Sequence, residues 1–115
     1  MAGFRIDRIS EDIKREIISL MRELKDPRVA GKMLTVVNVT VSNDLSYAKV
    51  YVSAMDGLAT AKEACKGLTS AQGYIRRALG NNLHLRKAPE LTFIADDSIE
   101  HSADIQRILR EIGEN

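Results

Sequence analysis

The sequence predicts an α+β fold in which helices pack on one face of a small sheet. Apolar residues recur every three or four positions over residues 5–25 and 60–85, which is the period of a helix. They alternate with polar residues over residues 35–42 and 47–55, as in a half-buried strand. A chain of 115 residues supports one modest core. We therefore expect a single two-layer domain spanning residues 1–115.

The first helix is predicted over residues 5–25. Asp26 and Pro27 end it, because the residue before a proline avoids the helical region. Its apolar face is formed by Ile6, Ile9, Ile13, Ile17, Leu20 and Leu24.

A hairpin of two antiparallel strands follows, from Thr35 to Ser42 and from Tyr47 to Met55. The residues between them, 43–46, contain an Asn-Asp pair that is typical of a turn. Tyr47 and Tyr51 lie on the same side of the second strand. Two interpretations stay open for them, stacking on RNA bases or packing as a cross-strand pair in the core.

The helical period of residues 60–85 falters at Ala71-Gln72-Gly73. Gln72 stands where the apolar stripe expects an apolar side chain, and a glycine within a helix costs about 1 kcal/mol relative to alanine. We therefore expect a kink or break at these three residues. Gly73 has two compatible interpretations, since it either lets the helix bend around the core or lets a sugar–phosphate chain approach the backbone, where free N–H groups favour an anion.

A third strand is predicted from Pro89 to Ala95, followed by a final helix capped by residues 96–98. The final helix carries Ile99, Ala103, Ile105, Ile108, Leu109 and Ile112. The expected order is therefore α-β-β-α-kink-α-β-α, with a sheet order that the sequence alone does not fix.

The distribution of charge favours a binding function. The net charge is only +1, but residues 62–87 carry six basic residues against one acid, and residues 88–115 carry seven acids against two basic residues. Such an asymmetry is typical of a contact with a polyanion on one side of a protein. The basic side chains of the broken helix and its exit are Lys62, Lys66, Arg76, Arg77, Arg86 and Lys87.

Catalysis finds little support in the sequence. Cys65 lies on the apolar stripe, where a small buried thiol is expected, and His84 and His101 stand at no metal-ligand spacing with a cysteine or carboxylate. We expect no enzyme activity, no cofactor and no metal. A small hydrolase that uses Cys65 or His84 is one alternative, and an adaptor whose basic face binds an acidic protein is another. The single cysteine and the lack of an apolar leader predict a cytoplasmic protein without membrane contact.

The chain resembles the ribosome-binding factor A family. The resemblance covers about residues 5–112 and rests on "DPR", "VTVSNDLSYAKVYVS", "AQGYIRRALG", "LRKAPELTFIADDSIE" and "IQRILREI". It implies a KH-like domain of type II, the bacterial arrangement, with a three-stranded sheet and a C-terminal helix. In this family an Ala-x-Gly kink replaces the Gly-x-x-Gly loop, and Ala71-Gln72-Gly73 matches that kink.

The resemblance also implies a function. Members bind free 30S ribosomal subunits and 16S rRNA, work with other assembly factors in late maturation that includes processing of the 16S 5′ end, and are needed in the cold. We expect a non-catalytic monomer with the same partners. The expected RNA-binding residues are Ala71, Gln72 and Gly73 at the kink, Arg76, Arg77, Arg86, Lys87, Lys62 and Lys66 around it, and Arg5 and Arg8 on the first helix.

Overall fold

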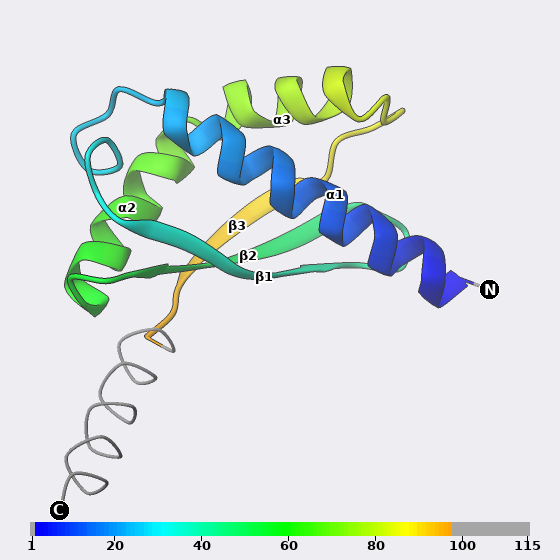
Figure 1. The fold of residues 1–115 in the computed structure, drawn as a ribbon. Coiled ribbons are helices and arrows are strands. Elements are labelled where there is room, and N and C mark those ends of the chain that lie inside the picture. Colours follow the sequence, from blue (N-terminus) through cyan, green and yellow to red (C-terminus); the bar gives the residue numbers. More distant parts are fainter. Residues whose placement is uncertain (1, 98–115) are drawn as a thin grey trace, which may run out of the picture.

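The computed structural model describes residues 2–97, with side chains from Ile6 onward. The elements in chain order are α1 (Ala2–Glu23), β1 (Leu34–Val41), β2 (Tyr47–Ala54), α2 (Leu58–Ser70), α3 (Gln72–Asn82) and β3 (Glu90–Ala95). The predicted C-terminal helix lies outside the described residues. The order of the described elements confirms the prediction, and Figure 1 shows the helices on one side of the sheet.

The sheet has the order β1-β2-β3. β1 and β2 form the predicted antiparallel hairpin, and a bulge between Val36 and Asn38 shifts its register. β3 pairs parallel to β2, with Tyr47 opposite Glu90 and Val52 opposite Ala95. This crossover through α2 and α3 gives the mixed sheet of a KH-like fold of type II.

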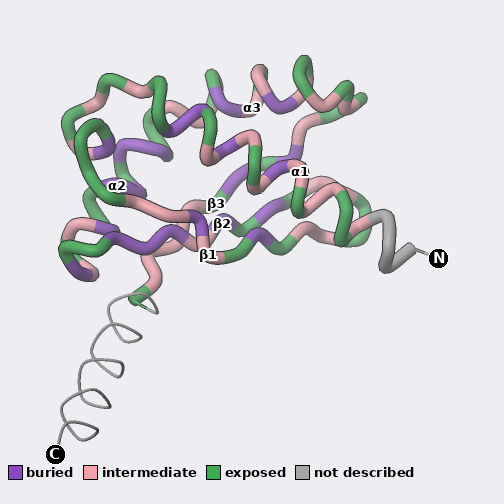
Figure 2. The backbone as a smooth tube through the Cα atoms, in the orientation of Figure 1, coloured by how far each residue is buried: buried purple, intermediate pink, exposed green. Residues whose placement is uncertain are grey.

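The core lies between the helices and one face of the sheet. Val50 and Val52 of β2 are fully buried, as are Ile13 and Ile17 of α1. Figure 2 shows the buried segments on the facing sides of helices and strands. No described element covers the opposite face of the sheet, here called the open face, and Tyr47 lies on it with 61% of its surface exposed. A core pair of tyrosines is therefore wrong for Tyr47, while Tyr51 is half-buried on the same open face.

Helix ends differ from the prediction by a few residues. α1 spans Ala2–Glu23, so it begins and ends earlier than the predicted 5–25. α2 begins at Leu58 because Gly57 adopts φ 114° and ψ 177°, a conformation that residues with a side chain rarely adopt.

The end of α3 is set by a left-handed residue. α3 ends at Asn82, before the predicted Leu85, since His84 takes the left-handed φ of 54°. The Leu85 N–H then donates to the Gly80 carbonyl, as in a Schellman turn.

The "DPR" residues fasten the loop after α1 to the end of α2. The guanidinium of Arg28 donates to both carboxylate oxygens of Asp26, at 3.0 and 2.7 Å, and approaches the Ser70 hydroxyl at 3.4 Å. The same pair holds the pKa of Asp26 at about 2, below its ordinary value of 3.8, mainly through the hydrogen bonds from Arg28. Gly67 of α2 lets this loop come close, because a Cβ there would lie 2.9 Å from Val29 Cγ2. The loop thereby supports α2 just before the helix break.

Candidate functional site at the helix break

The predicted interruption is confirmed, and it falls at Ala71. This residue has φ −91° and ψ 7°, so α2 ends before it and α3 begins after it. The Ala71 N–H is shared between the carbonyls of Gly67 and Leu68, and α3 then resumes with a bond from Ile75 to Ala71. Figure 1 shows the two helices running in different directions from this point. The cap amides at the turn donate to carbonyls of α2. The expected free N–H groups for an anion are therefore not found at these cap positions.

Gly73 lies in the first turn of α3 and is exposed. Its φ is not in the left-handed region, and a Cβ built on it would meet no atom of the described residues within 4 Å. Neither backbone conformation nor internal packing therefore requires glycine here. An alanine would favour the helix by up to about 1 kcal/mol. The missing side chain thus leaves bare main chain facing outward, which favours approach by an external molecule over a bend imposed by the core.

Gln72 points into the protein. Its side-chain Oε1 accepts a hydrogen bond from the Leu91 N–H at 2.9 Å. β3 is an edge strand whose Glu90 N–H donates to the Ser46 carbonyl, just before β2, so the next amide, that of Leu91, faces away from the sheet. The Gln72 side chain satisfies this amide and joins the break to β3.

Arg76 also turns toward β3. Its Nη2 donates to the Ala88 carbonyl at 3.0 Å, in the segment that leads into the strand. The side chain is half-buried, and its Nε is buried without a hydrogen-bond partner among the described residues. Arg76 and Gln72 therefore tie α3 to β3 and close the side of the break that faces the sheet edge.

Arg77 is exposed and lies on the side of α3 that faces α1. Among residues 2–97 it has no hydrogen bond or ion pair. The sequence pattern placed the two arginines side by side, but the structure separates their roles, with Arg76 bound to the chain itself and Arg77 open to solvent.

The other predicted cations are spread over several elements. Lys62 and Lys66 are exposed on α2, where Lys66 pairs with Glu63 at 2.9 Å. Such an exposed pair is weak and leaves the lysine available to a phosphate. Of the remaining predicted cations, Arg86 and Lys87 after α3 and Arg8 on α1 are exposed, while the side chain of Arg5 lies outside the described residues.

Tyr74 is a surface residue that the sequence pattern did not single out as a site residue. It follows Gly73 directly, and 51% of its surface is exposed. Its hydroxyl donates to Glu23 Oε2 of α1 at 3.4 Å. The available signal was its spacing of three from Arg77, which places both side chains on the same side of a helix.

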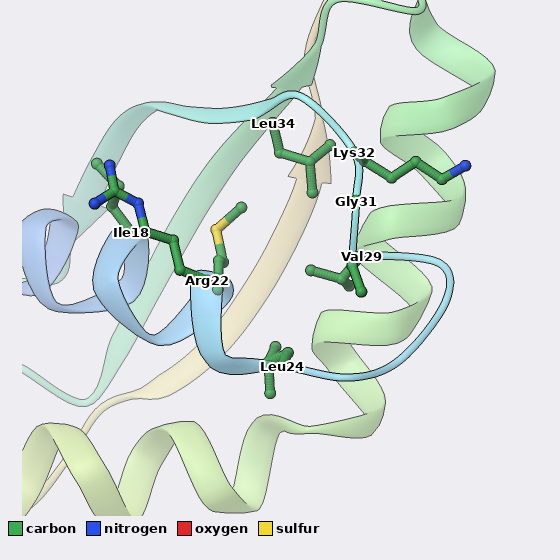
Figure 3. A pocket seen from close by; sticks show the side chains of 9 residues that line it. Ile18, Arg22, Leu24, Val29, Gly31, Lys32 and Leu34 are labelled. Atoms are coloured by element: carbon green, nitrogen blue, oxygen red, sulfur yellow. The ribbon is translucent and has the colours of Figure 1, made fainter.

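A cavity of about 300 Å³ lies elsewhere, between the end of α1 and the loop before β1. Figure 3 shows Ile18, Leu24, Val29 and Leu34 around it, with Arg22 and Lys32 also in its lining. None of the predicted RNA-binding residues lines it, so it stands apart from the helix break.

The structure does not support a catalytic role for the Cys65 thiol. Cys65 is buried, and desolvation raises the pKa of its thiol to about 11. A thiolate is therefore scarce near neutral pH. Over the described part of the chain, no three side chains of His, Cys, Asp or Glu gather as metal ligands do. In the same part, none of the helices has the length and apolar character needed to cross a membrane.

Comparisons with known proteins point to one family. Residues 5–109 match the family described as ribosome-binding factor A. The ribosome-binding factor A of Clostridium tetani is 45% identical over 116 residues, covering 100% of this chain and 95% of that protein. The crystal structure of the Thermus thermophilus protein is 29% identical with a TM-score of 0.67, covering 78% of this chain and 94% of that one.

A second structural relative was described in a complex. It is a homology model of Thermus thermophilus ribosome-binding factor A, fitted into a cryo-EM map of a 30S complex of that protein. It is 30% identical with a TM-score of 0.61, and covers 74% of this chain and 88% of that one.

Proposed function

Because the chain belongs to the ribosome-binding factor A family, we propose that it binds the free 30S ribosomal subunit through 16S rRNA. It acts there as a non-catalytic factor in late maturation of the subunit, including processing of the 16S 5′ end, and supports growth in the cold. It works as a cytoplasmic monomer of one domain, alongside other assembly factors. The observation that carries the proposal is the similarity to the Thermus thermophilus protein that was fitted into a map of its 30S complex.

The surface around the helix break supports a contact with RNA phosphates. Gly73 exposes main chain without a side chain, and Arg77 extends from the next turn without a partner among the described residues. Lys62, Arg86 and Lys87 add exposed charge on both sides. Each cation that neutralises a phosphate on a single strand makes the logarithm of affinity fall by about 0.7 per logarithmic unit of salt. Binding is therefore strong at low salt and weakens as salt rises.

Arg76 and Gln72 have a different part in this proposal. Their polar atoms are engaged by Ala88 and Leu91, so they set the position of α3 on β3. They contribute to binding indirectly, by fixing the direction in which Gly73 and Arg77 face.

The direct test is cofractionation with ribosomal particles on sucrose gradients. The wild-type protein is expected with free 30S subunits at low salt, to be lost from them at high salt, and to be absent from translating ribosomes. The variant with Lys62→Glu and Arg77→Glu is expected at the top of the gradient, whereas Lys49→Glu, on the open sheet face, behaves as wild type. Wild-type protein that stays at the top at low salt contradicts the proposal.

The role in maturation is tested in cells that lack the protein. They are expected to accumulate 16S precursor with an unprocessed 5′ end, most strongly at low temperature. The wild-type gene restores processing and the doubly reversed variant does not. Normal 5′ ends in the cold without the protein contradict this part of the proposal.

A further inference from the structure

A groove between α1 and α3 lies on the opposite side of α3 from the closed contact with β3. It encloses about 330 Å³ and is lined by both helices. Tyr74, Arg77 and Asn81 line it from α3, and Glu16, Ser19 and Glu23 line it from α1.

Side-chain hydrogen bonds between the helices hold both ends of this groove. At one end the Tyr74 hydroxyl donates to Glu23 at 3.4 Å, and at the other end Asn82 Nδ2 donates to Glu16 Oε1 at 2.5 Å. The groove is therefore a defined space whose walls are set by the packing of the two helices. A site with fixed walls loses less entropy on binding than one that must first be ordered.

The lining suits a flat, polar-edged molecule better than a phosphate. Leu20 and Ala78 contribute apolar surface, and Tyr74 offers a half-exposed ring. Around them stand donors, the Arg77 guanidinium and the Asn81 amide, and acceptors, the carboxylates of Glu16 and Glu23. Two carboxylates disfavour a phosphate in the groove but accept hydrogen bonds from the amino groups of bases. Proteins bind single-stranded RNA bases through such combinations of an aromatic ring, an arginine and polar groups at the base edge.

The position of the groove also suits an RNA strand. Tyr74 follows Gly73, where bare main chain leaves room for the sugar–phosphate backbone. The side toward β3 is occupied by Gln72 and Arg76, whose hydrogen bonds would have to break for a base to enter there. A strand that passes over Gly73 therefore meets the α1–α3 groove at the next residue, Tyr74, which lines it.

We propose that the α1–α3 groove holds one unstacked base of the RNA, stacked on Tyr74, with Arg77 bound to the adjacent phosphate. This inference rests on the proposed function and adds a ligand class and a residue, Tyr74, to it. It makes Tyr74 a binding residue for bases, whose contribution does not depend on salt in the way that a phosphate contact does.

Affinity for purified 30S subunits tests the proposal. Loss of a base stack is expected to weaken binding by Tyr74→Ala roughly 5- to 150-fold. Tyr74→Phe keeps the ring and is expected to bind within about twofold of wild type. Tyr47→Ala is the matched control, since Tyr47 is a similarly exposed tyrosine on the open sheet face. The slope of the logarithm of affinity against the logarithm of salt concentration separates a base contact from a phosphate contact. Tyr74→Ala is expected to leave this slope unchanged, and Arg77→Gln is expected to lower its magnitude by about 0.7.

Chemical probing of 16S rRNA identifies the occupant. Base-specific reagents that together cover all four bases are used. At least one base is expected to change its reactivity when the wild-type protein binds. Of the variants, only Tyr74→Ala is expected to return that base to its reactivity in the free subunit. Wild-type affinity of Tyr74→Ala overturns the base site, as does weaker binding without a base that reverts, since the groove then holds a ribosomal protein or nothing. If the wild-type protein does not bind 30S subunits, the proposed function itself is overturned. This outcome differs from failure of the base site, in which the wild-type protein still binds.

Discussion

The side-chain oxygen of Gln72 accepts a hydrogen bond from the backbone N–H of Leu91 at 2.9 Å. This bond joins the first residue of α3 to the edge strand of the sheet. Gln72 breaks the apolar stripe of the helix because it serves a polar group of the backbone, and the direction in which Gly73 and Arg77 face depends on that contact.

Gln72→Ala is expected to lower the free energy of unfolding by about 1–3 kcal/mol, because the amide of buried Leu91 then lacks its partner. Urea denaturation measures the change. Gln72→Glu is the control, since it keeps an acceptor oxygen and should recover much of the loss. Equal stability of Gln72→Ala and wild type would show that the bond contributes nothing.

The two adjacent arginines are expected to respond in opposite ways. Arg76→Ala loses the bond to Ala88 and the packing of a half-buried side chain, so its stability falls by about 1 kcal/mol or more. Arg77→Ala changes stability by less than about 0.5 kcal/mol because its side chain is exposed. Affinity for 30S subunits shows the reverse when both are measured under conditions where each variant is folded. If Arg77→Ala unfolds more readily than Arg76→Ala, the assignment of roles is wrong.

Gly73→Ala is expected to raise the free energy of unfolding by up to about 1 kcal/mol, since a Cβ there meets nothing and alanine favours the helix. The same change is expected to weaken binding to 30S subunits. Gly67→Ala provides the contrast, because its Cβ would lie 2.9 Å from Val29 and overpacking costs about 1–3 kcal/mol. A Gly73→Ala protein with wild-type affinity would argue that RNA does not approach the backbone at this point.

His84→Gly is expected to stabilise the protein by about 1 kcal/mol, because His84 adopts a left-handed conformation that glycine takes without strain. Thermal unfolding should show a higher Tm. His84→Ala keeps the Cβ and should gain little. A lower Tm for His84→Gly would mean that the imidazole makes a stabilising contact that outweighs the backbone strain.

Asp26 should make stability depend on pH in the acid range. Its pKa is about 2 in the folded protein against an ordinary 3.8, so its ionised form is favoured by folding. The contribution is therefore complete above about pH 4 to 5 and is lost as the pH falls through about 2. The difference in stability between wild type and Asp26→Asn should shrink over that window, as measured by urea denaturation at each pH. A difference that is constant from about pH 6 to about pH 2 would show that the Asp26 charge has no role.

The order of the helices and strands followed from local patterns in the sequence. The alternation in β1 and β2 and the stripe that includes Leu68, Ile75 and Leu79 reflect burial on one face, which the structure confirms. The interruption at Ala71 was also predictable, because Gln72 and Gly73 broke that stripe.

Much of the candidate site depended on contacts that no local pattern contains. The role of Gln72 requires that β3 be a parallel edge strand, which the sequence left open. A helical projection gives the angle between Arg76 and Arg77 but not which of them meets the segment at Ala88. The position of Tyr74 in the lining of a groove depends on the packing of α3 on α1, two elements that are far apart in the chain.

Directed cleavage of 16S rRNA from single cysteines tests the central claim most directly. Buried Cys65, with its raised thiol pKa, leaves an introduced surface cysteine as the residue that takes an iron–EDTA probe. Thr69→Cys places the probe on the last turn of α2, just before the break, and Thr92→Cys places it on β3, exposed to solvent. In complexes with 30S subunits we predict strong cleavage of 16S rRNA from Thr69→Cys and little from Thr92→Cys. Cleavage from Thr92→Cys with none from Thr69→Cys would contradict the account.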